Sequence, residues 1–242
     1  MIGPARRVLV AVPAYNEQPT IAGVVAGIRA AVPDFDLLIV NDASTDGTRD
    51  TLAALGVTTA THLANLGYGR ALQTAIKYAE RHGYDALVTV DADGQHDPRD
   101  IRTVFDRACA GGHDLLLGSR FVETRRYGSE PPLRRAGMRV FSLLLWMLTG
   151  QHIYDTSSGL KVIDARVFEL LTRRPFVDFH AESLVYLIKA GYSVGECPIT
   201  VERRRTGTSM YTPISSLKYP LKVCFLIVLS AIEATMMKRG AA

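Results

Sequence analysis

An apolar run that ends in two closely spaced carboxylates constrains this chain more than any other feature. Residues 86–90 read Ala-Leu-Val-Thr-Val and are followed at 91–95 by Asp-Ala-Asp-Gly-Gln. Alternate side chains of an extended backbone point the same way, so Asp91 and Asp93 can face one site. Two unit charges 4 Å apart repel by roughly 4 kcal/mol at an effective dielectric of about 20, and a divalent cation offsets this repulsion. Mg²⁺ and Mn²⁺ bind carboxylate oxygens and substrate phosphates, so the pair is a candidate metal site.

A solvated turn at a strand end would have the same short sequence, so the rest of the chain has to decide. Three further runs resemble residues 86–90, at 7–12, 36–40 and 113–117, and segments with helical spacing lie at 19–32, 48–55, 68–82 and 98–109. Alternating strands and helices predict an α/β fold with a mostly parallel central sheet and helices on both faces. The chain has 242 residues, 48% of them apolar, and contains no linker or repeat. We therefore expect one domain over residues 1–212 and an apolar helix over 213–242.

Polar loops follow these strands and should meet at one edge of the sheet, where open α/β sheets bind ligands. Residues 13–17 follow the first strand, 41–48 the second and 118–120 the strand at 113–117. Gly67 and Gly69 open a helix, but no strand directly precedes them and a third glycine is missing. A dinucleotide-binding oxidoreductase is therefore excluded.

Taken in order, these segments resemble a family 2 glycosyltransferase of the GT-A type. The matching segments are 12–17, 41–48, Asn65 with Gly67 and Gly69, 91–95, 118–121, 155–159 and 203–209. The resemblance covers about residues 7–210. Within the family, the chain is most similar to polyprenyl-phosphate sugar synthases of the dolichyl-phosphate mannosyltransferase kind. Those enzymes transfer a sugar from a nucleotide-diphosphate donor to the phosphate of a membrane-embedded isoprenoid.

The resemblance implies a role for each loop on the donor side. The residues expected to line the nucleotide pocket are Pro13, Tyr15, Glu17, Asp42 and Gly67. Asp91 would lie at the nucleotide-sugar, a GDP- or UDP-sugar, and is also a candidate metal ligand. Asp93 and Gln95 would hold Mg²⁺ or Mn²⁺ on the diphosphate, where positive charge stabilises the leaving group. Arg203 is a candidate contact for the same diphosphate because guanidinium groups match phosphate oxygens, although a solvated charged face is an equal alternative.

The nature of the acceptor decides whether a general base is needed. A lipid phosphate is already ionised near neutral pH, so positioning and charge neutralisation largely suffice, and Arg120 and Arg135 could bind it. A sugar hydroxyl needs a base. Asp155 is the best candidate for a base or for a residue that orients the acceptor, and a loop-capping aspartate is the alternative. Glu182 matches a position where family members often carry an acidic residue near the acceptor, or it is an exposed helical glutamate.

The distribution of charge in the sequence indicates which classes of molecule this protein can bind. The net charge of +4 and the pI near 9.0 come from scattered arginine clusters rather than a basic tail. This pattern suits phosphate groups or an anionic membrane better than nucleic acid, for which no motif is present. Three cysteines without metal-ligand spacing predict reduced thiols in a cytoplasmic setting. His96, His152 and His180 also lack metal spacing and are interpreted as loop or helix-start residues.

Residues 133–149 predict an amphipathic helix at a membrane. Arg134, Arg135 and Arg139 lead into an apolar run that contains Trp146. A spanning helix needs about 20 apolar residues, so this segment is too short to span. A helix with basic residues at one end and Trp and Leu along its length suits the membrane interface, and a buried core helix is the alternative.

Residues 217–237 form a second apolar segment, bracketed by Lys222 and Glu233. Related synthases often carry transmembrane helices after the catalytic domain, and we expect none here. We expect either an interfacial helix or docking onto a separate small membrane subunit. Both place the protein peripherally at the cytoplasmic face of the cell membrane.

The sequence thus favours metal-dependent, inverting transfer of a sugar from a nucleotide-sugar to a polyprenyl phosphate. Transfer to a hydroxyl of a lipid-linked or cell-surface glycan is the alternative within the family. A degenerate domain that serves as a scaffold for a membrane partner is disfavoured by the intact Glu17, Asp91 and Asp93.

Overall fold

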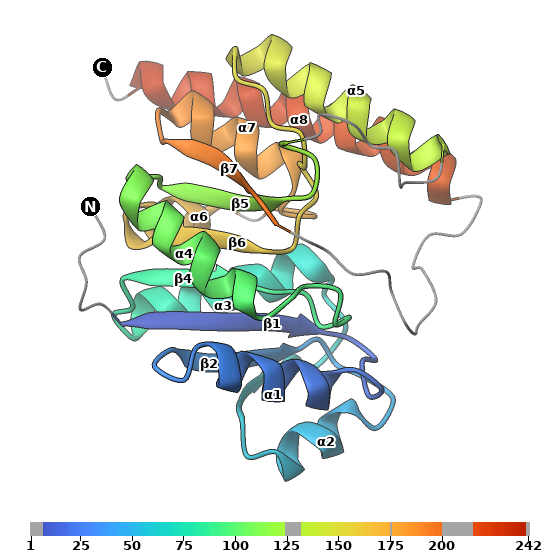
Figure 1. Cartoon of the computed structure of the whole chain (residues 1–242). Helices are drawn as coiled ribbons and strands as arrows, with labels where there is room; N and C mark the ends of the chain where they lie inside the picture. The colour runs from blue at the N-terminus through green and yellow to red at the C-terminus, as the bar shows by residue number, and fades with distance from the viewer. Residues whose placement is uncertain (1–6, 124–131, 175, 200–214, 241–242) are drawn as a thin grey trace.

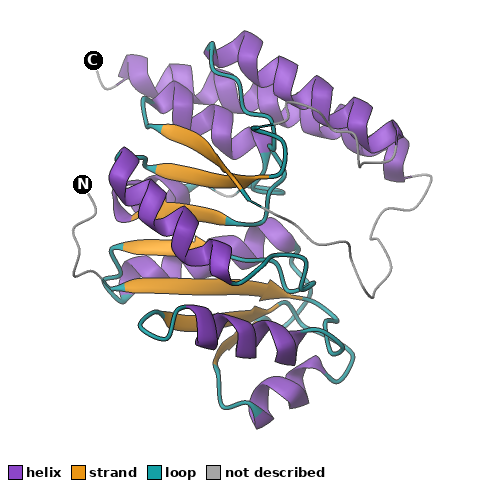
Figure 2. Cartoon of the chain, in the orientation of Figure 1, coloured by secondary structure: helices purple, strands orange, loops and turns teal. Residues whose placement is uncertain are grey.

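In the computed structural model, the described residues form a seven-stranded sheet between two layers of helices (Figures 1 and 2). The structure describes residues 7–123, 132–174, 176–199 and 215–240. The strands, in spatial order, are β3 (Thr58–Thr61), β2 (Asp36–Asn41), β1 (Val8–Ala14), β4 (Ala86–Thr89), β6 (Lys161–Asp164), β5 (Leu115–Ser119) and β7 (Val194–Pro198). All neighbouring pairs are parallel except those of β6, which runs antiparallel to both β4 and β5. The predicted mostly parallel sheet is confirmed.

Helices cover both faces of this sheet, as predicted. One face is covered by α1 (Ile21–Ala31), α2 (Thr48–Ala54) and α4 (Arg99–Gly111). The other is covered by α3 (Tyr68–Arg81), η1 (Ala165–Val167), α6 (Phe168–Arg173) and α7 (Ala181–Ala190), with α5 (Pro132–Thr149) and α8 (Ser215–Gly240) packed outside α7. Side chains alternate along β1, so Val10 packs on the first face and Leu9 on the second. This two-sided burial explains why β1 reads as a continuous apolar run.

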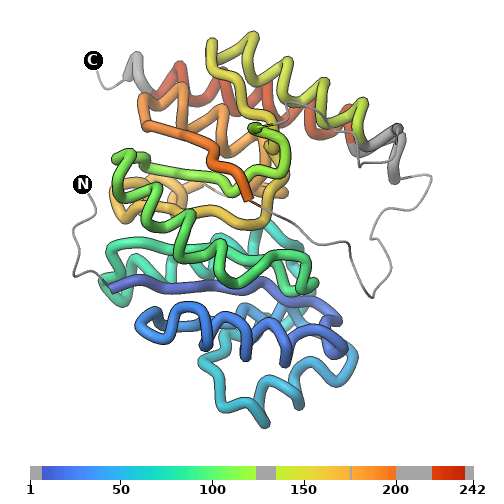
Figure 3. The backbone as a smooth tube through the Cα atoms, viewed as in Figure 1, coloured from blue at the N-terminus to red at the C-terminus, as the bar shows by residue number. Residues whose placement is uncertain are grey.

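The antiparallel strand β6 determines where the site can form. Lys161, the first residue of β6, lies opposite Thr89 at the end of β4 and opposite Leu117 near the end of β5. The chain therefore enters β6 at the edge of the sheet where its two neighbours end (Figure 3). The loop before β6 is thereby brought to the same edge as the loops after β1, β2 and β4.

Helix α8 is docked on the domain along one side. Its buried side chains include Val223 and Ile227, which belong to the core cluster under α7. Two ion pairs add to this packing, one between Arg174 and Glu233 and one of 3.2 Å between Lys222 Nζ and Asp178 Oδ2. The opposite side of the helix is exposed and apolar along its length, at Leu221, Phe225, Val228, Ile232 and Met236.

Part of α8 passes the length and composition test for a membrane span. Among the described residues only Pro220–Met237 does so, with a mean hydropathy of 1.7. Lys222 and Glu233, which bracket the apolar centre of the segment, both lie within this stretch. A docked helix of a soluble domain can have the same composition. The interfacial, non-spanning role of α5 and the division after residue 212 both stay predictions.

Because one side of α8 packs on the domain, an isoleucine-to-alanine change should lower the free energy of unfolding more on that side than on the exposed side. Ile227 is fully buried and Ile232 is 52% exposed. Ile227→Ala should lower the free energy of unfolding by about 2–5 kcal/mol through lost burial and the cavity left behind. Ile232→Ala should change it by less than about 0.5 kcal/mol. Urea unfolding measures both, and equal effects would mean that α8 is not packed on the domain.

Candidate active site

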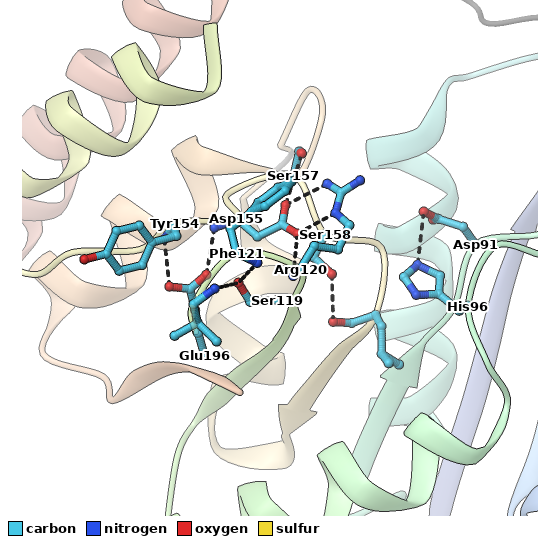
Figure 4. Close-up of polar contacts among 12 residues, drawn as sticks. Asp91, His96, Ser119, Arg120, Phe121, Tyr154, Asp155, Ser157, Ser158 and Glu196 are labelled. Atoms are coloured by element: carbon cyan, nitrogen blue, oxygen red, sulfur yellow. Dashed lines mark hydrogen bonds and ion pairs between the residues drawn. The ribbon is translucent and has the colours of Figure 1, made fainter. Parts of the chain in front are cut away.

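The two carboxylates singled out by the sequence lie in the loop after β4, at the carboxyl edge of the sheet. Asp91 Oδ1 accepts a hydrogen bond from the Tyr68 hydroxyl at 3.1 Å, and its Oδ2 lies 3.8 Å from His96 Nε2 (Figure 4). Asp93 Oδ1 accepts from the Gln95 backbone N–H at 3.0 Å. The predicted donor-side residues Asp91, Asp93 and Gln95 are thus brought together. The contact of His96 with Asp91 was missed, because the sequence identified His96 only as a loop residue.

The surroundings of Asp91 hold it in the ionised form. Burial acts to raise its pKa, but His96, the positive charge of Lys161 and the Tyr68 hydroxyl all favour the carboxylate. Together they lower the pKa of Asp91 to about 2. The same contact works in the opposite direction on Tyr68, since burial and the negative charge of Asp91 raise the pKa of its hydroxyl well above the usual value. Asp91 is therefore an anion at neutral pH.

The loop that carries Asp155 lies directly against Asp91. A Cβ on Gly159 would fall 1.9 Å from Asp91 Oδ2, so glycine is required there by close approach. The Gly159 carbonyl accepts a hydrogen bond from Thr89 Oγ1 at 2.7 Å, which fixes the loop to the end of β4. The predicted acceptor loop and the predicted donor carboxylate therefore form one site.

Arg120 and Asp155 form a bidentate ion pair at the end of β5 (Figure 4). Arg120 Nε donates to Asp155 Oδ2 at 2.8 Å and Nη2 donates to Oδ1 at 2.9 Å. Asp155 is fully buried. Its backbone N–H and that of Tyr154 donate to the two carboxylate oxygens of Glu196, each at 2.7 Å. The pair is thus anchored to β7 as well as to β5.

These contacts bear on the two roles considered for Asp155. Both of its oxygens are engaged by Arg120, and the side chain has no exposed surface. The contacts with Arg120 and the burial favour an orienting role for Asp155. The role of Asp155 as a general base stays a prediction. The charge of Arg120 is compensated by Asp155, so binding of an acceptor phosphate by Arg120 also stays a prediction.

Asp42, the first residue after β2, binds the loop between β3 and α3 through its carboxylate. Its carboxylate is buried and lies 2.7 Å from His62 Nδ1. It accepts hydrogen bonds from the backbone N–H groups of Leu66 at 2.9 Å and Gly67 at 2.8 Å. Gly67 has a φ of +89°, a conformation that favours glycine. Asp42 and Gly67 are therefore neighbours, and their predicted role in a nucleotide pocket stays a prediction.

Hydrogen bonds connect the loop after β1 to the loop after β2. Asn16, with a φ of +56°, accepts a hydrogen bond from the Thr45 backbone N–H at 2.8 Å. The backbone N–H of Glu17 donates to Thr48 Oγ1 at 2.9 Å. Pro13 is buried within β1, whereas Tyr15 is 40% exposed at the edge. The predicted pocket residues of the first two loops therefore lie side by side.

The acidic loop fits a hard divalent cation by the chemistry of its donors. Asp91, Asp93 and Gln95 all offer oxygen ligands, which Mg²⁺ and Mn²⁺ prefer. Within the described residues no three His, Cys, Asp or Glu side chains cluster as a complete metal set. Two carboxylates with an amide oxygen match the sites that Mg²⁺ completes with substrate phosphates and water.

Lys161 and Glu182 are charged residues near this site whose burial the sequence analysis did not predict. Lys161 is fully buried, and its Nζ donates to the Ser158 carbonyl. Burial lowers the pKa of Lys161 to about 8, against the opposing attraction of the carboxylates of Asp91, Asp155 and Glu182. Glu182 accepts from the Phe179 backbone N–H at 2.7 Å and is buried, so the alternative of an exposed helical glutamate is wrong.

Arg203 and the rest of segment 203–209 lie outside the described residues, as does the side chain of Arg134. Arg135 is half-buried on α5.

Comparison with known proteins identifies the family. The sequence pattern described as Glycosyl transferase family 2 matches residues 9–172, which include every described site loop. The chain belongs to this family. It is 31% identical over 219 residues to the polyprenol monophosphomannose synthase of Mycolicibacterium smegmatis, covering 86% of this chain and 82% of the relative. It is 29% identical over 212 residues to the undecaprenyl-phosphate mannosyltransferase of Micrococcus luteus, covering 84% and 86%.

Solved structures of glucosyl-3-phosphoglycerate synthase share the fold. Glucosyl-3-phosphoglycerate synthase from Mycobacterium tuberculosis, crystallised with Mn²⁺, UDP-glucose and phosphoglyceric acid, matches with a TM-score of 0.69 at 20% identity. The match covers 93% of this chain and 80% of the synthase. The GT-A fold expected from the resemblance is confirmed.

Breaking the Arg120–Asp155 pair should be costly. Asp155→Asn leaves Arg120 without its counter-charge, and removing one partner of a buried pair typically lowers stability by about 3–5 kcal/mol. The matched change Asp97→Asn breaks the exposed pair with Arg99 and should leave the unfolding midpoint unchanged. Urea unfolding compares the two variants. A D155N protein as stable as the wild type would contradict the buried pair.

Lys161 should leave a signature in the pH dependence of stability. Its pKa is lowered from 10.5 to about 8 in the folded chain, so between these values the unfolded chain holds a proton that the folded chain has lost. The contribution of Lys161 to the free energy of unfolding therefore rises with pH from about 8 to 10.5. Lys161→Met should abolish this rise, whereas Lys77→Met at an exposed position should retain it. Urea unfolding at several pH values tests this, and an unchanged pH profile in K161M would contradict it.

Proposed function

We propose that this protein transfers a sugar from a nucleotide-diphosphate sugar to a polyprenyl phosphate, with inversion at the anomeric carbon. The names of the relatives support the acceptor class, since one is a polyprenol monophosphomannose synthase and another an undecaprenyl-phosphate mannosyltransferase. The observation that carries the choice of acceptor is the state of Asp155. The best candidate for a base is fully buried, and both of its oxygens accept hydrogen bonds from Arg120. An ionised phosphate needs no base, whereas a hydroxyl acceptor does.

On the donor side, the nucleotide is bound at the ends of β1 and β2 and at the start of α3, through Pro13, Tyr15, Glu17, Asp42 and Gly67. Asp93 and Gln95 would hold Mg²⁺ or Mn²⁺, and Asp91 beside them would face the donor sugar. When bound, such an ion stabilises the negative charge of the departing diphosphate. Arg203 assists by donating to the same diphosphate. The Mn²⁺ and UDP-glucose in the structurally similar synthase support a metal and a nucleotide-sugar.

On the acceptor side, the phosphate is held by positive charge near the end of β5. Arg120 and Arg135 are the residues proposed for this contact, and Asp155 keeps Arg120 in a fixed orientation. Attack from the face opposite the leaving diphosphate inverts the anomeric centre. Positioning two bound reactants can by itself supply several kcal/mol of catalysis.

The acceptor lies in a membrane, so the protein must reach one. We propose that it binds peripherally at the cytoplasmic face, through α5 and α8. Exposed apolar side chains on both helices support this, namely Val140, Leu143, Trp146 and Met147 on α5 and Leu221, Phe225, Ile232 and Met236 on α8. A small membrane subunit that covers the same side chains is the alternative, and nucleic acid is not proposed as a partner.

The transfer itself is tested with a matched pair of acceptors. The purified protein is incubated with GDP-mannose, UDP-glucose or UDP-N-acetylglucosamine, with Mn²⁺ or Mg²⁺, and with either undecaprenyl phosphate or undecaprenol. We expect a glycolipid product with undecaprenyl phosphate but not with undecaprenol. NMR should show that its anomeric configuration is opposite to that of the donor. Product formed from hydroxyl acceptors but not from the phosphate would contradict the proposal.

The metal role predicts a sharp loss on changing one loop residue. Asp93→Asn removes a charged ligand and should lower kcat by at least about 100-fold, the size of effect seen when a group that stabilises transition-state charge is removed. Asp97→Asn, four residues on, should keep wild-type activity. Chelation with EDTA should abolish the activity of the wild type, and full activity in EDTA would refute metal dependence.

Membrane binding should depend on the exposed side of α8. Phe225→Asp combined with Ile232→Asp places two charges among exposed apolar side chains and should abolish co-sedimentation with vesicles that contain anionic lipid. The matched control, Ala30→Asp with Ala53→Asp, places the same charges on α1 and α2 and should bind as the wild type does. Equal binding of both double variants would exclude α8 as the contact.

A further inference from the structure

Tyr68 contacts both Asp91 and His180, the residue that precedes α7, and none of the proposed catalytic or binding roles includes it. It is the first residue of α3, directly after Gly67, so its side chain starts at the carboxyl edge of the sheet. Its hydroxyl donates to Asp91 Oδ1 at 3.1 Å. Hydrogen bonds to a charged group are among the stronger ones in proteins, and this one fixes a carboxylate at the centre of the site.

The ring of Tyr68 is itself held in place. It stacks on His180, with ring centroids 5.4 Å apart and an interplanar angle of 25°. His180 precedes α7, and its backbone N–H donates to Glu182 Oε2 at 3.2 Å. Gly69, which follows Tyr68 in α3, packs tightly against the loop before α7. A Cβ at Gly69 would lie 2.3 Å from the Val177 carbonyl oxygen. The first turn of α3 is therefore wedged against the loop before α7, and Tyr68 has little freedom to move.

Two further segments lie against Asp91, whose side chain keeps 32% of its surface exposed. His96 lies 3.8 Å from Oδ2, and the α-carbon of Gly159 occupies the space behind the same oxygen. Three separate segments of the chain thus contact one carboxylate: the start of α3, the loop after β4 and the loop before β6. Of these contacts, the Tyr68 hydrogen bond holds Oδ1.

We propose that Tyr68 is a positioning residue for the transfer reaction, whose hydroxyl holds the Asp91 carboxylate in the orientation that the donor sugar meets. The inference rests on the proposed function and adds a residue to it. Without this hydrogen bond, Asp91 can rotate about its side-chain bonds while Asp93 and Gln95 keep their places. The nucleotide diphosphate and its metal should then bind as before, and the sugar should be presented less well to the acceptor.

The chain offers a matched pair of tyrosines to test this. Tyr68→Phe removes the hydroxyl that donates to Asp91, and Tyr84→Phe removes one that donates to Asp36 Oδ2 at 2.8 Å, at the start of β2 and the opposite edge of the sheet. Loss of a hydrogen bond to a charged group should lower kcat of Y68F by about 10- to 100-fold. Y84F should keep kcat within about twofold of the wild type.

Further measurements separate positioning from general damage. Isothermal titration should give Y68F the wild-type affinity for Mn²⁺ with UDP or GDP, and a weaker affinity for the corresponding nucleotide-sugar. Gly159→Ala pushes Asp91 from the other side and should give the same split. Thermal unfolding should show Y68F folded, because the ring and its stacking on His180 are retained.

The outcomes distinguish this inference from the proposed function. A Y68F protein with wild-type kcat overturns the inference, and so does a parallel loss of Mn²⁺–nucleotide affinity, which would place Tyr68 in the metal site. If the wild type uses a hydroxyl acceptor, the proposed acceptor is wrong and the Tyr68 comparison is made with that acceptor. A wild-type protein that binds no nucleotide-sugar overturns both proposals.

Discussion

The antiparallel pairing of β6 with both of its neighbours is the constraint on which the site depends. Because Lys161 lies opposite Thr89 and Leu117, the chain enters β6 where β4 and β5 end. In an all-parallel sheet the loop before this strand would lie at the far edge. Here residues 155–159 cross the carboxyl ends of β4 and β5 and meet the loops that bind ligands in open α/β sheets. One reversed strand thus brings the predicted acceptor loop onto the predicted donor loop.

That convergence buries charge, and the structure compensates each charge locally. Asp155 is paired with Arg120, Asp91 is surrounded by Tyr68, His96 and the charge of Lys161, and Glu182 accepts backbone N–H bonds. Buried charges without partners are strongly destabilising, so these groups hold one another in place. An environment of fixed, already oriented charges can also stabilise the charge of a departing diphosphate, because little has to reorganise during the reaction.

The sequence could predict those parts of the molecule whose causes are local. Strands β1 and β4 are buried on both faces and read as apolar runs, and each ends in a polar loop that the resemblance matched. Strand β6 gave no comparable pattern, because it is four residues long and bounded by Lys161 and Asp164. The partner of Asp155 lies 35 residues away, and the contact of Gly159 with Asp91 spans 68 residues, so neither follows from local spacing. Such contacts also decide which carboxylates are exposed, which is why the burial of Glu182 was missed.

The most direct test of this account is a crystal structure of the protein with Mn²⁺ and UDP or GDP, with the metal located by its anomalous scattering. The account predicts one manganese peak within ligand distance of an Asp93 carboxylate oxygen, and a diphosphate bound to that metal at the carboxyl edge of β4. A diphosphate bound away from Asp93, with no manganese in the loop after β4, would contradict it.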